Sequence, residues 1–251
     1  MILDVNGIRL YWEETGTGEP LLWLHGGMGC GADWRYIFKD APAGYRLIAP
    51  DLRAHGSSID PSGAFSFRQC ARDVQALLQH LGLPSVKAIG LSGGGIVLLH
   101  MATSLPASIS RMVIVSAPPY FPEQARALQR QLSPAALGEA EMARMRARHK
   151  GGDEQIRQLF DIVHAMALDH DDVSFTPSVL STITAETLIV FGDRDPLYPV
   201  SIAFELQHAI QRSYLWVVPN GGHGPVFGPA AEQFSNTVLA FLGGKWESST
   251  K

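Results

Sequence analysis

Six short apolar segments, separated by stretches with helical spacing, constrain the fold more than any other feature of the chain. They are residues 21–24, 45–49, 86–91, 111–116, 187–191 and 214–218. Within each segment the apolar residues are mostly consecutive, which is typical of strands buried on both faces. Strands that alternate with helices favour a mostly parallel sheet with helices on both sides. The pattern therefore predicts an α/β fold.

The first residues of the chain predict a different kind of pairing. Asn6 and Gly7 lie between two strand-like runs, residues 2–5 and 8–12. An Asn-Gly dipeptide in this position favours a two-residue type I′ turn. The chain is therefore expected to begin with an antiparallel hairpin, which brings the sheet to roughly eight strands.

The alternation of strands and helices lapses between residues 119 and 185. Three segments there have helical spacing with no strand between them, residues 124–132, 134–149 and 153–168. We expect a small helical cap inserted after the sixth strand. The predicted domains are an α/β core at residues 1–118 and 186–243, the cap at residues 119–185, and a flexible polar tail at residues 244–251.

Composition excludes several classes of protein. The 251 residues, 46% of them hydrophobic, suffice for one domain with a buried core. A net charge of −4 gives no positive field for nucleic-acid phosphates, and two cysteines are too few for a disulfide framework. There is neither a signal-like N-terminus nor an apolar stretch of roughly 18 residues. We expect a soluble cytoplasmic protein with no nucleic-acid or membrane partner, either monomer or homodimer.

Residues 90–94 read Gly-Leu-Ser-Gly-Gly and match the pattern G-x-S-x-G. A strand-like run, residues 86–89, precedes the motif and a helix-like run, residues 95–101, follows it. This strand-turn-helix setting is the one that a nucleophile elbow requires, and the glycines leave room for its sharp turn. The motif predicts Ser92 as a nucleophile whose hydroxyl projects above the sheet edge.

Together with two further segments, this motif resembles the α/β-hydrolase superfamily over nearly the whole chain. Residues 25–29 read His-Gly-Gly-Met-Gly and resemble the family's oxyanion loop. Residues 51–58 read Asp-Leu-Arg-Ala-His-Gly-Ser-Ser and resemble its D-x-R-G-H-G-x-S loop, departing from it at Ala54. The resemblance implies an α/β-hydrolase fold, with the backbone amides of Gly27 and Gly93 as oxyanion donors. We expect His25 and the second loop to be structural.

The family order of nucleophile, acid and histidine places the general base late in the chain. His223 lies in a glycine-rich loop after the last strand-like run, from which it can reach Ser92. His80, His100 and His208 fall in helical patterns, where a structural or surface histidine is usual. The predicted base is therefore His223.

Two carboxylates compete for the role of orienting that histidine. Residues 192–199 read Gly-Asp-Arg-Asp-Pro-Leu-Tyr-Pro. The family pattern G-x-x-D-x-x-x-P falls on Asp195, whereas Asp193 occupies a variable position with Arg194 as a ready surface ion-pair partner. Asp195 is therefore the predicted acid.

These roles imply a serine hydrolase in which Ser92 attacks a carbonyl carbon, His223 takes its proton and water resolves the acyl-enzyme. No step needs a metal or an organic cofactor. Residues 169–172 read Asp-His-Asp-Asp, with His164 nearby, and superficially resemble a set of metal ligands. We interpret them as a solvated turn, because four adjacent residues cannot all face one ion.

The first expectation for the reaction is hydrolysis of a small-molecule carboxylic ester, lactones included, in a mainly apolar pocket. Ser92 excludes the dehalogenases and epoxide hydrolases of the superfamily, which carry aspartate at the elbow. Four alternatives remain open: a carbon-carbon bond hydrolase, an acyltransferase or perhydrolase, a proline-iminopeptidase-like amidase, and a small-molecule receptor that retains the triad. The candidate pocket residues are Met28, Met142, Met145, Phe160, Met166, Leu197 and Val226.

Overall fold

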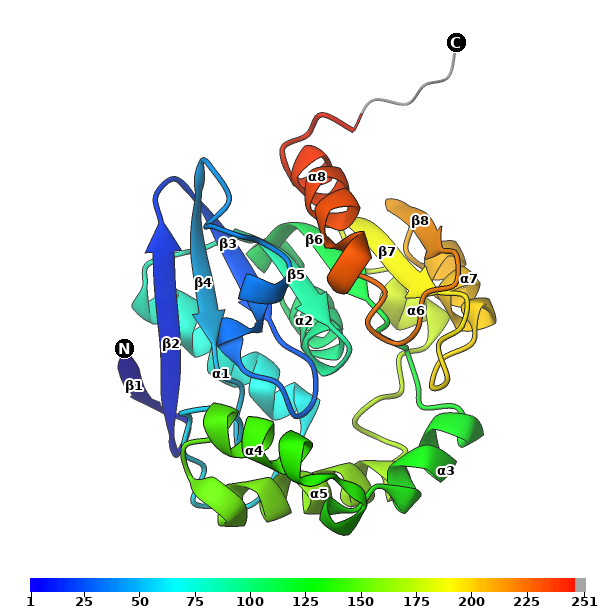
Figure 1. The fold of residues 1–251 in the computed structure, drawn as a ribbon. Coiled ribbons are helices and arrows are strands. Elements are labelled where there is room, and N and C mark those ends of the chain that lie inside the picture. The colour runs from blue at the N-terminus through cyan, green and yellow to red at the C-terminus, as the bar shows by residue number, and fades with distance from the viewer. Residues whose placement is uncertain (247–251) are drawn as a thin grey trace.

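The computed structural model describes residues 1–246 and is built around one sheet of eight strands (Figure 1). The strands lie in the order β1-β2-β4-β3-β5-β6-β7-β8. Those from β4 to β8 pair in parallel, while β2 is antiparallel to both β1 and β4. The predicted fold class, a mostly parallel sheet flanked by helices, is therefore confirmed. The strands are β1 (Ile2–Val5), β2 (Ile8–Gly16), β3 (Glu19–Leu24), β4 (Tyr45–Pro50), β5 (Val86–Leu91), β6 (Ile109–Val115), β7 (Glu186–Gly192) and β8 (Ser213–Val218).

The hairpin predicted from Asn6 and Gly7 joins β1 to β2. Val5 pairs with Ile8, so the two residues between them form the whole turn. Both have positive φ angles, 48° at Asn6 and 80° at Gly7, as a type I′ turn requires.

Neighbouring residues of β3 show why the apolar segments are continuous. Leu22 and Leu24 pack on one face of the sheet, whereas Leu21 and Trp23 pack on the other, and none of the four is exposed. Successive side chains of a strand point to opposite faces, so a strand covered on both sides needs apolar residues throughout. Helices α1 (Phe67–His80), α2 (Gly93–Ser104) and α7 (Val200–Ala209) cover the first face, and α8 (Ala231–Leu242) covers the second.

Four helices lie between β6 and β7 in the chain, within the segment predicted as a cap. Helices α3, α4 and α5 lie beside the end of the sheet at which the parallel strand β4 terminates (Figure 1). Strands β3 to β8 run in the same direction as β4, so the cap lies over the carboxyl ends of the parallel strands. The helices are α3 (Glu123–Gln131), α4 (Glu139–Arg148), α5 (Gly152–Leu168) and α6 (Pro177–Leu180).

One expected helix differs in the structure. Residues 134–149 form a 3₁₀ turn, Pro134–Ala136, and then α4, rather than one helix. Leu137 and Gly138 between them have extended backbones, with ψ angles of 132° and 161°. Glycine is a poor helix former, and Gly138 serves as the N-cap of α4. The chain therefore breaks before Glu139, although the apolar spacing in the sequence continues across that break. Of the predicted tail, residues 247–251 lie outside the described residues.

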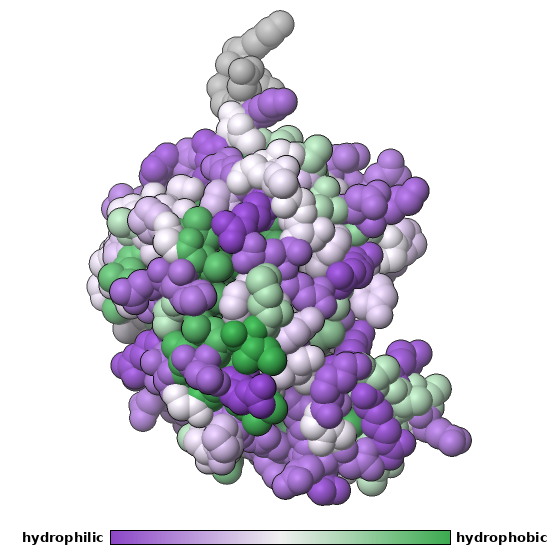
Figure 2. All heavy atoms as spheres, turned by 90° about the vertical axis from the view of Figure 1, so that its left-hand side faces the viewer, coloured by the Kyte–Doolittle hydropathy of each residue, from purple (hydrophilic) through white to green (hydrophobic). Residues whose placement is uncertain are grey.

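The surface beside β1 mixes apolar and polar residues. A patch of hydrophobic residues is visible among polar ones on the side of the molecule that carries this edge strand (Figure 2). Met1, Ile2 and Ile59 are each about half exposed. No helix within residues 1–246 has the length and apolar character needed to cross a membrane.

Candidate active site

Ser92 lies at a sharp turn between β5 and α2. Its backbone has φ 49° and ψ −115°, a combination that costs a non-glycine residue about 1–3 kcal/mol. The Ser92 N–H donates to the carbonyl of Val115 at 2.7 Å, which helps to hold the turn against β6. The neighbouring chain is too close for side chains on either side: a Cβ on Gly90 would lie 2.6 Å from the Gly94 oxygen. The sequence thus folds into the expected elbow.

Asp195 and His223 come from two further loops and meet Ser92 at the carboxyl edge of the sheet. His223 Nε2 lies 2.9 Å from Ser92 Oγ, and His223 Nδ1 lies 2.9 Å from Asp195 Oδ2. The Asp195 side chain is fully buried and that of His223 is 29% exposed. The structure therefore brings together the three side chains that the sequence singled out.

Backbone contacts fix how the carboxylate of Asp195 faces the imidazole. Its Oδ1 accepts hydrogen bonds from the N–H groups of Leu197 at 2.8 Å and Tyr198 at 3.2 Å, which leaves Oδ2 for His223. With the carboxylate accepting, His223 carries its proton on Nδ1 and Nε2 is free to accept the Ser92 hydroxyl proton. Asp193 and Arg194 are exposed, and no ion pair joins them in the part of the chain that the structure describes.

Tyr198 is a neighbour of the site that sequence reasoning missed. Its ring centroid lies 5.3 Å from that of His223, nearly edge-on, and the residue is only 3% exposed. Burial, together with the charge of Asp195, raises the pKa of the Tyr198 hydroxyl, so the ring acts as a neutral wall beside the imidazole. Its place between Asp195 and Pro199 was the available signal.

The loop after β3 lies against the elbow. A Cβ on Gly26 would lie 3.4 Å from Ser92 Cβ, and a Cβ on Gly93 would lie 3.6 Å from the Gly27 nitrogen. Within residues 1–246, neither the Gly27 nor the Gly93 N–H donates to another group. Two unused N–H groups beside a serine hydroxyl are what an oxyanion hole needs.

His25 ties this loop to the loop after β4. Its Nδ1 donates to the Gly26 carbonyl at 2.7 Å, and its Nε2 accepts from the Leu52 N–H at 2.9 Å. Complete burial lowers the pKa of His25 to about 4, so the imidazole is neutral at ordinary pH. Because both nitrogens are engaged, His25 has no free position from which to exchange a proton with substrate.

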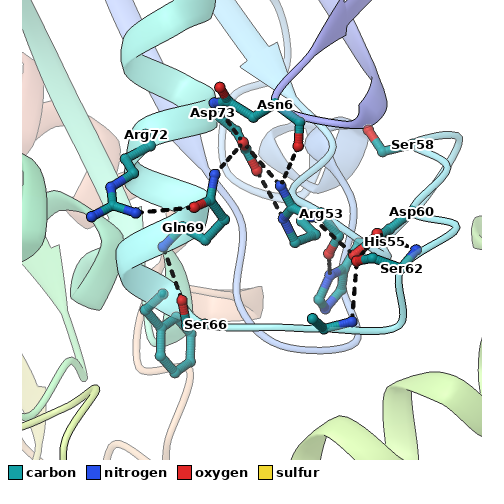
Figure 3. A network of polar contacts seen from close by, with 12 residues as sticks. Asn6, Arg53, His55, Ser58, Asp60, Ser62, Ser66, Gln69, Arg72 and Asp73 are labelled. Atoms are coloured by element: carbon teal, nitrogen blue, oxygen red, sulfur yellow. Dashed lines mark hydrogen bonds and ion pairs between the residues drawn. The ribbon is translucent and has the colours of Figure 1, made fainter.

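A buried ion pair anchors the loop after β4 to helix α1 (Figure 3). The Arg53 guanidinium contacts both carboxylate oxygens of Asp73, at 3.0 and 3.1 Å, and Asp60 at 3.2 Å. All three side chains are nearly inaccessible to solvent. Removing any one of them would leave a buried charge without its partner, which is strongly destabilising. The loop expected to be structural thus has a dense set of contacts.

A small cavity adjoins the elbow on the cap side, and a larger cavity lies next to it. The first contacts Gly27 and Gly93 and has a volume of about 20 Å³, room for roughly one water molecule. The second, of about 380 Å³, opens between α5 and residues 63–67. Four apolar residues line both cavities and separate them: Phe65, Phe67, Ile162 and Met166.

The predicted pocket residues are divided by the structure. Met28 and Met166 line the small cavity, and the partly buried Leu197 packs against the core beside Asp195. Met145 and Phe160 are instead buried in a cluster at the cap-core contact, against which Met142 also packs. Val226 is fully buried on the α8 side of the sheet. These last four residues do not line the small cavity: the cap-core cluster takes up the apolar surfaces of Met142, Met145 and Phe160, and the α8 side of the sheet that of Val226.

The acidic turn at residues 169–172 requires a correction. No group of three or more potential ligands within residues 1–246 could hold a metal ion. However, Asp172 is not simply solvated: its carboxylate accepts from the N–H groups of Phe67 at 2.5 Å and Arg68 at 3.2 Å. These are unpaired donors at the start of α1, where a negative charge is favourable. Asp172 therefore fastens the cap to the core.

Comparisons with known proteins support the same fold. Residues 19–140 match the model of the alpha/beta hydrolase fold family. The chain is 29% identical to a serine hydrolase, BPHL, of Mus musculus over 95% of the chain and 84% of that protein. It is 27% identical to a 2-hydroxymuconate semialdehyde hydrolase of Pseudomonas sp. (strain CF600), over 94% and 91% respectively. The solved structure of a thermophilic esterase from Thermogutta terrifontis is similar with a TM-score of 0.73 and 25% identity over 94% of each chain.

Proposed function

Since the chain belongs to the α/β-hydrolase superfamily, we propose that it is a serine hydrolase that cleaves carboxylic esters through an acyl-enzyme on Ser92. The observation that carries the proposal is the unbroken line of contacts from Ser92 Oγ through His223 to Asp195, at 2.9 Å for each step. A nucleophile, its base and the group that orients the base are the parts that acyl transfer needs.

The proposed reaction begins when Ser92 Oγ attacks the ester carbonyl carbon and its proton passes to His223 Nε2. Asp195 stabilises the resulting imidazolium, and the Gly27 and Gly93 N–H groups hold the negative oxygen of the tetrahedral intermediate. His223 then protonates the departing alcohol, leaving the acyl group on Ser92. A water molecule, deprotonated by His223, releases the acid.

The size of the small cavity favours short acyl groups. With about 20 Å³ beside Gly27 and Gly93, it accommodates little more than a methyl group without movement of Phe65 or Met166. An alkyl group that fills such an apolar space gains about 0.8 kcal/mol for each buried methylene, whereas one that overfills it forces side chains apart. Acetate esters and small lactones are therefore the proposed substrates.

Nitrophenyl esters of increasing acyl length test this proposal on the wild type, on Ser92→Ala and on Ser178→Ala, an exposed serine of the cap. We expect the wild type and Ser178→Ala to turn over acetate best, and Ser92→Ala to lose at least about 1000-fold in kcat. Equal rates in Ser92→Ala and the wild type would exclude Ser92 as the nucleophile.

The relative from Pseudomonas favours a second candidate, cleavage of a carbon-carbon bond next to a carbonyl group. That relative is a 2-hydroxymuconate semialdehyde hydrolase and matches nearly the whole chain. The same three side chains would serve this reaction. A panel of unsaturated diketones, assayed beside the esters, distinguishes the two: a kcat/KM higher on a diketone than on any ester would replace the ester proposal.

A further inference from the structure

One histidine of the cap is fully buried and contacts the catalytic loops. His149, the C-cap residue directly after α4, has 0% of its surface exposed. Its Nδ1 accepts from the Gly56 N–H at 2.9 Å, and its Nε2 lies 3.1 Å from the Met28 carbonyl oxygen. Since Nδ1 accepts, Nε2 carries the proton and donates to Met28. His149 thus joins the loop after β4 to the loop that contains Gly27.

The contact with Met28 continues, peptide by peptide, to the Gly27 N–H. The Met28 carbonyl and the Gly29 N–H belong to one peptide group, and that N–H donates to the Gly26 carbonyl at 3.1 Å. The Gly26 carbonyl belongs in turn to the peptide whose N–H is that of Gly27. Peptide groups are planar, so fixing each carbonyl also fixes the N–H on its other side.

Hydrogen bonds linked in this way also strengthen one another, because each donor is polarised by the bond that its carbonyl accepts. The loop needs such support, since Met28 has a φ of 59°, a left-handed conformation that costs a residue with a Cβ about 1–2 kcal/mol. A strained backbone persists only where its surroundings hold it.

We propose that His149 is a positioning residue for the oxyanion hole, so that the Gly27 N–H is fully aligned only when the cap is docked. The inference rests on the proposed function, because it gives Gly27 the part of an oxyanion donor. Adjacent contacts make the docking local: the Lys150 N–H donates to the Gly56 carbonyl at 2.9 Å, and Gln155 Nε2 donates to the Ala54 carbonyl at 3.0 Å.

The arrangement requires a neutral imidazole. A second proton on His149 would lie on Nδ1 and face the Gly56 N–H, with no acceptor between them. The groups around it are His55, at a ring-centroid distance of 6.1 Å, Arg148 on its own helix, and Asp33 and His25 on the core side. Burial, with a smaller contribution from Arg148, lowers the pKa of His149 below its usual value, so the bond to Gly56 survives to mildly acidic pH.

The test uses a fluorophosphonate, which labels Ser92 whatever the natural substrate is. Ser92 Oγ displaces fluoride from phosphorus, its proton passes to His223, and the phosphoryl oxygen occupies the oxyanion hole. The variants are His149→Ala, His149→Gln and His149→Asn. Glutamine keeps an N–H donor near the position of Nε2, asparagine keeps an acceptor near that of Nδ1, and His170→Ala is a control at an exposed cap histidine.

We expect His149→Ala to slow labelling and to lower kcat on acetate esters by about 10- to 100-fold, less than the loss of a whole oxyanion donor. KM should change less than about threefold, because the alignment matters most in the transition state. Glutamine should recover most of the rate and asparagine little of it. In the wild type, the acid limb of kcat/KM should be steeper than in His149→Gln, because the variant lacks the imidazole whose protonation breaks the contact with Gly56.

Several outcomes would overturn the inference: wild-type labelling rates in folded His149→Ala, an equal loss in His170→Ala, identical acid slopes in the wild type and His149→Gln, or asparagine restoring as much rate as glutamine. The last comparison stands even where the alanine variant fails to fold. Failure of the wild type to label at Ser92 would instead contradict the proposed function itself.

Discussion

The elbow at Ser92 and the loop at Gly27 supply the two halves of one candidate site, yet they are held in different ways. The elbow is fixed by backbone contacts between β5, α2 and β6, all within the core. The Gly27 loop is fixed by two imidazoles, one from the core at His25 and one from the cap at His149. The nucleophile is thus placed by contacts within the core, whereas the oxyanion loop also depends on a residue of the cap. Four experiments test this contrast.

The largest effect is expected at Asp195, on the rigid side of the site. In Asp195→Asn the carbonyl oxygen should keep the bonds from the Leu197 and Tyr198 N–H groups, so the amide NH₂ would face His223 Nδ1. The imidazole would then carry its proton on Nε2 and could not accept from Ser92. We expect kcat to fall about 10⁴-fold at an unchanged melting temperature. Asp193→Asn is the matched control and should keep wild-type kcat.

Alanine substitutions at Gly94 and Gly27 should separate the two regions by stability. A Cβ on Gly94 would lie 2.3 Å from the Leu24 oxygen, a backbone atom that cannot move aside, whereas a Cβ on Gly27 would meet nothing within 4 Å. We expect Gly94→Ala to lose about 3 kcal/mol or more of unfolding free energy, and Gly27→Ala to stay within about 1 kcal/mol of wild type. Urea unfolding measures both. Equal losses would show that the loop is packed as tightly as the elbow.

Acid should weaken the loop region through its buried histidines. Burial lowers the pKa values of His25, His55 and His149, that of His25 to about 4. Unfolded histidines titrate near 6.5, so as the pH falls the unfolded chain takes up protons first. The stabilisation is complete above about pH 6.5 and is lost towards pH 4, with His25 alone contributing about 3 kcal/mol. The urea midpoint should decline more across this pH range in the wild type than in His25→Asn. Equal declines in the two proteins would contradict the lowered pKa of His25.

The smallest effect concerns selectivity. Met166 separates the cavity beside Gly27 from the larger one beyond it. Met166→Ala should join them, so that the preference of kcat/KM for acetate over hexanoate esters shifts by about tenfold towards the longer chain, as burial of further methylenes allows. Leu168→Ala, at an exposed position two residues away, should leave the preference unchanged. An unaltered chain-length profile in Met166→Ala would place the acyl group elsewhere.

The same contrast explains how much the sequence could reveal. The strands were predictable because a doubly covered sheet demands consecutive apolar residues, as in Leu21 to Leu24. The elbow was predictable because its glycines and serine are adjacent in the chain. The elbow is formed by neighbouring residues, so the sequence motif alone predicts its geometry.

Contacts between distant segments were not predictable in this way. Nothing around His149 distinguishes it from a surface residue, since its partners Met28 and Gly56 lie about a hundred positions earlier. Asp172 was interpreted as solvated although it binds the start of α1, and Met145 and Phe160 were assigned to a pocket although they pack against Ala54. In each case the contact between cap and core determines where the side chain lies. The spacing of apolar residues along the chain does not predict that contact.

The backbone angles of Ser92 carry a consequence for how such a protein changes over generations. A glycine there would relieve the unfavourable φ of 49° and make the fold sturdier while abolishing the chemistry proposed for it. A lineage selected for heat tolerance alone would gain by discarding this serine. Its retention would therefore record continued demand for turnover rather than for durability.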